Sequence, residues 1–173
     1  IVRVTGDCPL TDPALIDKLI NEFNKSNLDY ISTSPKTFPD GFDIEIFSFQ
    51  VLKKMKKITK NQYDLEHVTS YIRRNKEKFK TKEIHFDKDF SFIKLSIDNN
   101  EDLLRVKKVF HHFKPNIYFS IYDIFNKKNI DKILNKELKK KNHLQIKNKN
   151  GQKIWNRAKK NIAGGNMILS KNP

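Results

Sequence analysis

The chain has 173 residues, of which 37% are hydrophobic and 32% are charged, and its formal net charge is +15. This length allows one ordinary domain, or one domain with a tail, and 13 phenylalanines can supply much of a core. The single cysteine, Cys8, excludes a disulfide framework and a cysteine-based zinc site. The sequence also has no run of 18 apolar residues of the kind that spans a membrane.

The positive charge is concentrated near the carboxyl end. Residues 131–173 carry 12 Lys and Arg against 2 Asp and Glu, which is two thirds of the net charge. Nearly all of this excess is lysine among many asparagines, which indicates solvated helix faces and a compositional bias. A basic patch that binds nucleic acid or another anionic polymer is the alternative, but neither base-reading arginines nor stacking aromatics gather on one face, so nucleic acid is not the favoured partner.

The first segment predicts a strand, a loop and a helix. Residues 1–5 have the apolar character of a buried strand, and residues 6–9 form a tight loop after it. Asp12 and Pro13 are typical of an N-cap and of the first helical position, and apolar residues then recur at helical spacing as far as Phe23. Because the sequence starts inside a strand, we expect it to be part of a longer protein.

Strands and helices then alternate along the chain. Further strands are expected at residues 29–32, 43–47, 84–86 and 92–97, and further helices at residues 48–59, 65–75, 99–110 and 117–126. This alternation predicts an α/β fold with a mainly parallel sheet flanked by helices, and a helical C-terminal tail. We divide the chain into a domain over residues 1–126, a Lys/Asn-rich linker over 127–150, and the start of another domain over 151–173.

Two carboxylates follow predicted strands. Asp7 comes after the first strand and Asp98 after the last one. Ligands of parallel α/β sheets bind at the carboxyl ends of the strands, so the two side chains could share a hard divalent cation such as Mg²⁺. On spacing alone, the alternative is that Asp7 stabilises a turn and Asp98 starts a helix.

Four blocks occur in a fixed order over about 110 residues. They are residues 2–13 (VRVTGDCPLTDP), 37–45 (TFPDGFDIE), 66–75 (EHVTSYIRRN) and 95–103 (LSIDNNEDL). Together they resemble the cytidylyltransferases of the spore coat polysaccharide biosynthesis protein F type, which are relatives of the acylneuraminate and 3-deoxy-manno-octulosonate cytidylyltransferases. The sequence departs from that pattern at Ser70, where the family has Pro, and at Asn99 and Asn100, where it has Thr-Pro.

The resemblance implies part of a nucleotide-diphospho-sugar transferase fold and a defined reaction. A hydroxyl of a sugar, expected to be an acidic sugar, would attack the α-phosphate of CTP to give a CMP-sugar and pyrophosphate. The family's metal aspartates fall on Asp7 and Asp98, which would hold Mg²⁺, and Gly6 would let the backbone approach the nucleotide. The alternatives are a nucleotidyltransferase that uses another nucleoside triphosphate, and a basic α/β module that binds nucleic acid or an anionic polymer.

The two middle blocks, residues 37–45 and 66–75, supply candidate substrate-binding residues. These candidates are Asp43, Glu45, Glu66, His67, Arg73 and Arg74. The two acids of the strand could contact sugar hydroxyls or form an exposed polar face. The histidine could orient the sugar or act as a base, with a partly buried structural role as the alternative. The arginines could pair with the carboxylate of an acidic sugar or with phosphate, or they could lie at a homodimer contact or in solvent.

The end of the sequence has a second resemblance. Residues 154–171 (IWNRAKKNIAGGNMILSK) are similar to the start of a class III, pyridoxal-phosphate-dependent aminotransferase of the glutamate-1-semialdehyde aminomutase type. This implies a fusion in which pyridoxal phosphate binds only in a downstream domain. The family also grips its nucleotide with a Gly/Arg/Lys-rich loop that does not precede Ile1 here, so we expect this chain to have little or no activity alone. We expect the full protein to act in the cytoplasm.

Overall fold

The structure is a computed structural model that describes residues 1–134. Its strands are β1 (Val2–Arg3), β2 (Tyr30–Thr33), β3 (Glu45–Phe47) and β4 (Thr81–Ile84). Its helices are α1 (Pro13–Lys25), α2 (Phe49–Ile58), α3 (Gln62–His67), α4 (Ser70–Arg74), the 3₁₀ helix η1 (Lys76–Lys78), α5 (Asn100–Phe113), α6 (Ile121–Ile124) and α7 (Lys127–Ile133). Residues 1–133 form one compact unit. None of the described helices is long and apolar enough to cross a bilayer.

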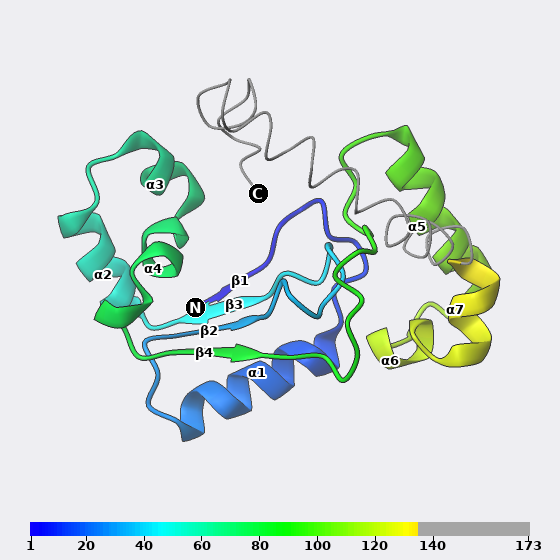
Figure 1. Ribbon diagram of the computed structural model, residues 1–173, viewed down its shortest axis with the longest axis horizontal. Coiled ribbons are helices and arrows are strands. Elements are labelled where there is room, and N and C mark those ends of the chain that lie inside the picture. Colours follow the sequence, from blue (N-terminus) through cyan, green and yellow to red (C-terminus); the bar gives the residue numbers. More distant parts are fainter. Residues whose placement is uncertain (135–173) are drawn as a thin grey trace, which may run out of the picture. The chain divides into compact units, whose positions relative to one another are not determined.

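The strands form one sheet in the order β1-β3-β2-β4. Within the described unit, Figure 1 shows α1 alongside this sheet, α2–α4 at one end of the strands and α5–α7 at the other. The predicted α/β class, a single sheet flanked by helices, is confirmed. The pairing differs from the expected mainly parallel arrangement, because β3 runs antiparallel to both β1 and β2 and only β2 and β4 are parallel. A loop returns the chain from β2 directly to β3, and such a connection gives antiparallel strands without a crossover helix.

The predicted start of the first helix is confirmed in detail. The Asp12 carboxylate accepts a hydrogen bond of 2.8 Å from the backbone N–H of Ala14, and Pro13 takes the first helical position. The same carboxylate also accepts from the backbone N–H of Ile121 at 2.9 Å. Asp12 therefore begins α1 and at the same time holds the start of α6, a contact between distant parts of the sequence that the N-cap pattern does not indicate.

Two predicted elements differ from the structure. The strand expected at residues 92–97 is an extended segment with a single bridge, between Lys94 and Asp40, because its hydrogen-bonding partner is a loop rather than a strand. The helix expected at residues 65–75 is divided into α3 and α4 at Val68, whose φ of 50° is unfavourable for a β-branched residue. Strain of this kind costs about 1–3 kcal/mol and persists where surrounding contacts determine the backbone.

The other predicted boundaries shift by a few residues. The fourth strand begins earlier than expected, at Thr81, and the short helix α6 occupies only part of the range 117–126. Residues 127–133 belong to the predicted linker, but they form α7, and this helix contacts α5 and α6. The predicted segments after residue 134, including the tail helix and the aminotransferase-like residues 154–171, lie outside the described residues. The division into three domains remains a prediction.

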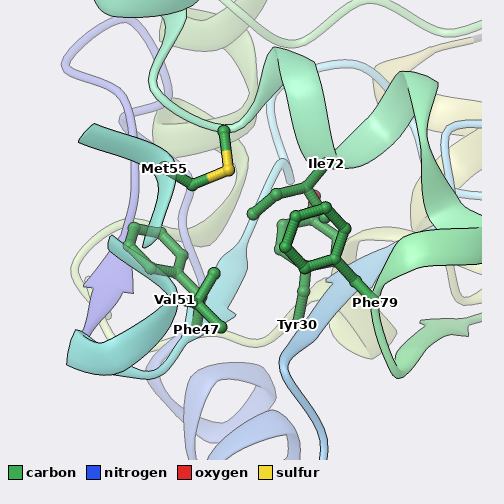
Figure 2. Packing of buried hydrophobic residues seen from close by; sticks show 6 residues of the cluster. All are labelled: Tyr30, Phe47, Val51, Met55, Ile72 and Phe79. Atoms are coloured by element: carbon green, nitrogen blue, oxygen red, sulfur yellow. The ribbon is translucent and has the colours of Figure 1, made fainter. Parts of the chain in front are cut away.

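A hydrophobic cluster joins helices α2 and α4 to the sheet. Its buried members are Tyr30, Phe47, Val51, Met55, Ile72 and Phe79. Figure 2 shows these side chains directed toward one another from the strands and from the helices. Truncation of a buried Met or Ile of this kind to Ala costs about 2–5 kcal/mol. The cluster therefore fixes helix α4, which carries both candidate arginines, relative to the strand that carries Glu45.

A second group of aromatic side chains holds the loop between β2 and β3. The Phe86 ring lies 5.2 Å from Phe38 and 5.9 Å from Phe125, measured between ring centroids. Phe42 contacts Phe125 in an edge-on arrangement at 6.5 Å. Aromatic pairs at these separations add about 0.5–1.5 kcal/mol each to the burial of their surface. The FPDG loop over residues 38–41 is therefore held on both sides by packed rings.

Candidate functional site

The first and last sequence blocks meet through the backbone. The N–H of Ile97 donates a hydrogen bond of 2.9 Å to the backbone carbonyl of Asp7. Asp98 follows Ile97 directly, so the loop of Asp7 and the segment of Asp98 lie side by side although 90 residues separate them in the chain. The pairing of these two segments, which spacing alone left open, is thus present in the structure.

The FPDG loop is hydrogen-bonded to the extended segment that precedes Asp98. The backbone N–H of Asp40 donates to Ile93 at 3.0 Å, and its carbonyl accepts from Leu95 at 2.7 Å. Gly41 has a φ of 104°, and a Cβ atom built on it would lie 2.6 Å from the backbone carbon of Leu95. No side chain fits at that position, so the close approach of the two backbones requires glycine there.

Asp7 lies on the surface, in the loop that is hydrogen-bonded to the segment of Asp98. Its pKa is lowered first by a hydrogen bond from the Thr5 side chain, and the positive charge of Lys94 lowers it further. The carboxylate is therefore ionised at neutral pH and can bind a cation. Next to it, burial raises the pKa of the Cys8 thiol to about 11, and the negative charges of Asp7 and Asp43 act in the same direction. A protonated, buried thiol is a poor nucleophile, which agrees with a structural role for Cys8.

Asp98 is exposed and belongs to a network of charged side chains. Lys94 forms ion pairs with Asp98 and, at 2.6 Å, with Asp102. Asp102 is buried, accepts from the backbone N–H of Asp98 at 3.1 Å, and pairs with Arg105 at 2.8 Å. The hydrogen bond from Lys94, and then the one from Arg105, lower the pKa of Asp102. Sequence reasoning missed this network, although Lys94 is the one charged residue within the apolar segment 92–97.

A cavity of about 400 Å³ opens beside these loops. Its lining includes Arg3, Thr5, Asp43, Glu45, Arg73 and Lys76. Thr5 connects the cavity with the loop of Asp7, because its hydroxyl lies 3.1 Å from the sulfur of Cys8 and its side chain bonds to Asp7. The second and third sequence blocks therefore contribute side chains to one concave site that adjoins the Asp7 loop.

Glu45 is buried in the wall of this cavity, with both carboxylate oxygens engaged. Arg3 donates at 2.5 Å, Tyr30 at 2.5 Å, and the Thr69 hydroxyl lies 2.8 and 2.9 Å from the two oxygens. The Nε atom of Arg73 lies farther away, at 3.9 Å. The strained turn at Val68 brings Thr69 to this carboxylate. Glu45 thus joins the sheet to the turn between α3 and α4, and we assign it a positioning role.

Asp43 is placed differently from Glu45, although both come from the same strand region. Its side chain is open to the cavity, and one oxygen accepts from the backbone N–H of Gly41 at 3.3 Å. Its pKa is raised, first by partial desolvation in the recess and then by the negative charges of Asp40 and Glu45. Arg73 acts in the opposite direction. A carboxylate with a raised pKa in a cavity is a candidate for proton transfer or for binding a hydroxyl group.

The two candidate arginines have separate surroundings. Arg74 donates to both oxygens of the buried Asp64, at 2.6 and 2.8 Å, and Ser70 donates to the same carboxylate at 2.5 Å. Arg73 is half-exposed and lines the cavity. Arg74 therefore holds α4 to α3 by a structural contact, whereas Arg73 is directed to the side where a ligand can reach it.

The remaining candidates lie away from the cavity. Glu66 is exposed on α3, and His67 is half-buried with its ring centroid 4.3 Å from that of Tyr63. Neither residue is part of the cavity lining. The structure thus brings Asp43, Glu45 and Arg73 together, and it places Glu66, His67 and Arg74 outside that group.

The carboxylates of Asp7 and Asp98 are oxygen ligands of the kind that Mg²⁺ takes. Among residues 1–134, no three His, Cys, Asp or Glu side chains lie together in a way that could hold a metal ion. Mg²⁺ is commonly bound by one or two carboxylates together with waters and substrate phosphates. Two exposed carboxylates on neighbouring segments are consistent with that mode, in which most of the coordinating oxygens come from the ligand.

Comparison with known proteins gives a consistent result. Residues 1–154 match the model of a family described as cytidylyltransferase. The solved structure of a cytidylyltransferase from Leptospira borgpetersenii is 36% identical, with a TM-score of 0.71, over 78% of this chain and 58% of that one. An uncharacterized protein of Methanocaldococcus jannaschii is 35% identical over 84% of this chain and 61% of its own length. The spore coat polysaccharide biosynthesis protein SpsF of Bacillus subtilis is 31% identical over 64% of this chain and 46% of its own. The chain therefore spans 46% to 61% of the length of these relatives.

Proposed function

Because this chain belongs to the cytidylyltransferase family, we propose that it provides the metal-binding and sugar-binding part of a nucleotidyltransferase. In the proposed reaction, a sugar hydroxyl attacks the α-phosphate of CTP, a CMP-sugar forms, and pyrophosphate leaves. The observation that carries the proposal is the hydrogen bond between Ile97 and Asp7, because it brings the two candidate metal aspartates to neighbouring positions.

Asp7 and Asp98 are the residues that would hold Mg²⁺. Both are exposed carboxylates, and the lowered pKa of Asp7 keeps its charge available at neutral pH. When bound, Mg²⁺ supplies charge neutralisation on the phosphate oxygens. Gly6 supports the same assignment, because a Cβ atom there would meet no protein atom within 4 Å. Packing therefore does not account for this glycine, and its open surroundings leave room for the nucleotide that we propose to approach the backbone here.

Asp43 and Arg73 are the residues that we propose for the sugar. Arg3 is engaged with Glu45, and Lys76 with Glu83, so Arg73 is the cation of the cavity with the loosest protein contact. An arginine in that position can bind a carboxylate through two parallel hydrogen bonds, which favours an acidic sugar. Asp43 can accept the proton of the attacking hydroxyl, because its raised pKa makes it a stronger base than an ordinary aspartate.

The metal assignment is tested by titration with Mn²⁺, followed by electron paramagnetic resonance, in the presence of CTP. We expect Asp7→Asn and Asp98→Asn each to weaken Mn²⁺ binding at least about tenfold, since each removes a charged ligand. Asp17→Asn, on the exposed face of α1, is the matched control and should bind like the unchanged chain. Equal Mn²⁺ affinity in all four proteins would refute the assignment.

The biological role of the whole protein is also part of the proposal. We propose a role in polysaccharide biosynthesis, on the basis of the similarity to SpsF, and a cytoplasmic location. We also propose that this chain alone does not release pyrophosphate from CTP with a panel of acidic sugars, because it spans only part of the length of its relatives. Robust turnover would contradict this. A downstream aminotransferase that carries pyridoxal phosphate, and a homodimer, remain predictions from the sequence.

A further inference from the structure

Lys94 lies among the acidic groups of the proposed metal site. Its ammonium group contacts Asp98 and Asp102, the latter at 2.6 Å. The segment that carries Lys94 and Asp98 is also joined to the loop of Asp7, through the hydrogen bond from the N–H of Ile97. One ammonium group thus contacts an aspartate that we assign to the metal and a second, buried carboxylate, beside the loop of the other aspartate.

Asp102 is the fixed end of this arrangement. Its side chain is only 4% exposed, against 62% for Asp98. Besides Lys94, it binds Arg105 at 2.8 Å and the backbone N–H of Asp98 at 3.1 Å. Arg105 already compensates the buried negative charge of Asp102, so Lys94 is not needed for that purpose alone. Lys94 can therefore remain attached to Asp102 while its contact with Asp98 is made or broken.

The two candidate metal ligands need such a cation when no metal is bound. Asp7 and the segment of Asp98 are joined by the hydrogen bond of Ile97, so the two acidic residues come from neighbouring stretches of backbone. Like charges at short separation disfavour one another unless a cation compensates them. In the described part of the chain, Lys94 is the residue placed to do this.

We propose that Lys94 is the resident counter-ion of the Asp7–Asp98 pair, and that a divalent cation must displace it from Asp98. This inference rests on the proposed function and assigns Lys94 as a positioning residue. The ammonium group opposes a bare divalent ion, whose charge is positive. It does not oppose a complex of the ion with a nucleoside triphosphate, whose net charge is negative. Lys94 thereby favours the metal–triphosphate complex over the metal alone.

The test measures Mn²⁺ binding by electron paramagnetic resonance with and without CTP. In Lys94→Met the stem of the side chain is kept and the charge is removed. We expect this variant to bind Mn²⁺ alone about tenfold more tightly than the unchanged chain, since the repulsion between cations is lost. With CTP present, the gain should disappear or reverse. Lys94→Arg keeps the charge and should retain the original preference.

The controls separate the inference from the function on which it rests. Lys107→Met removes the same charge from an exposed position of α5 and should leave both affinities unchanged. If Asp98→Asn weakens Mn²⁺ binding but Lys94→Met equals the unchanged chain, Lys94 is not the counter-ion. If no variant binds Mn²⁺, the metal pair itself is refuted, and the inference with it. Should Lys94→Met fail to fold, the double variant with Asp102→Asn removes the buried charge as well and gives the same comparison.

Discussion

Replacement of Glu45 by Gln tests the contact that joins helices α3 and α4 to the sheet. Gln has the shape of Glu, so the oxygen that meets Tyr30 and Thr69 can stay in place. The new NH₂ group, however, faces the guanidinium of Arg3, which donated to the lost oxygen at 2.5 Å. The change therefore removes the charge-assisted hydrogen bond from Arg3, and one of the two contacts of the Thr69 hydroxyl, from a side chain that is 6% exposed.

The size of the effect follows mainly from the lost bond with Arg3, because the Thr69 hydroxyl keeps its contact with the remaining oxygen. Hydrogen bonds to charged groups contribute about 1.5–3 kcal/mol, and Arg3 is partly exposed, so we expect a loss of about 2 kcal/mol. For a domain of this size, that loss lowers the melting temperature by roughly 4–8 °C. Urea unfolding followed by circular dichroism measures it directly.

Glu77→Gln is the matched control, because Glu77 is exposed on η1. That variant should stay within about 0.5 kcal/mol of the unchanged chain. If Glu45→Gln and Glu77→Gln unfold at the same urea midpoint with the same slope, the role of Glu45 as the link between sheet and helices is refuted.

Three further predictions concern the loops of the site. Gly41→Ala should lower the free energy of unfolding, measured in urea, by at least about 2 kcal/mol, because it combines a clash with Leu95 and a disfavoured φ. Gly6→Ala should change it by less than about 0.5 kcal/mol, and equal effects of the two variants would contradict the packing of the FPDG loop. Cys8, whose pKa is raised to about 11, should react with iodoacetamide at pH 8 at least about tenfold more slowly than in urea-unfolded chain, and rapid labelling of the folded chain would refute its burial. The pKa of Asp43 is raised in the folded state, so its carboxylate opposes folding once the pH exceeds the pKa of the unfolded state. The stability of Asp43→Asn relative to the unchanged chain should therefore increase between pH 3 and pH 7, and a constant difference would contradict this.

The sequence predicts well those features that depend on local chemistry. The N-cap at Asp12, the helix that starts after Ser48 and the helix that starts after Asn99 all appear where the side chains place them. Each depends on a short polar side chain that accepts from the backbone N–H groups of the next turn. Such contacts involve residues that are neighbours in the chain, so a pattern of a few letters is sufficient to predict them.

The contacts of the site are harder to predict because they join distant segments. Residues 92–97 have the composition of a strand, but their partner is the FPDG loop, which no periodicity indicates. Arg73 and Arg74 are adjacent and chemically equal, yet one lines the cavity and the other binds Asp64. The direction of each side chain follows from the broken helix at Val68, and that break serves a contact with Glu45 from another block.

The chain leaves the sheet for helices α2–α4 and returns to it on either side of Tyr30. Tyr30 of β2 is paired with Phe47, after which the chain departs toward α2, and with Thr81, where it returns. The entry and the exit of this excursion are thus separated by the width of a single strand. A longer, shorter or differently shaped excursion could be accommodated there without any change in the register of the strands. Members of the family could in this way differ in the cavity wall that α4 supplies while keeping the loops of Asp7 and Asp98.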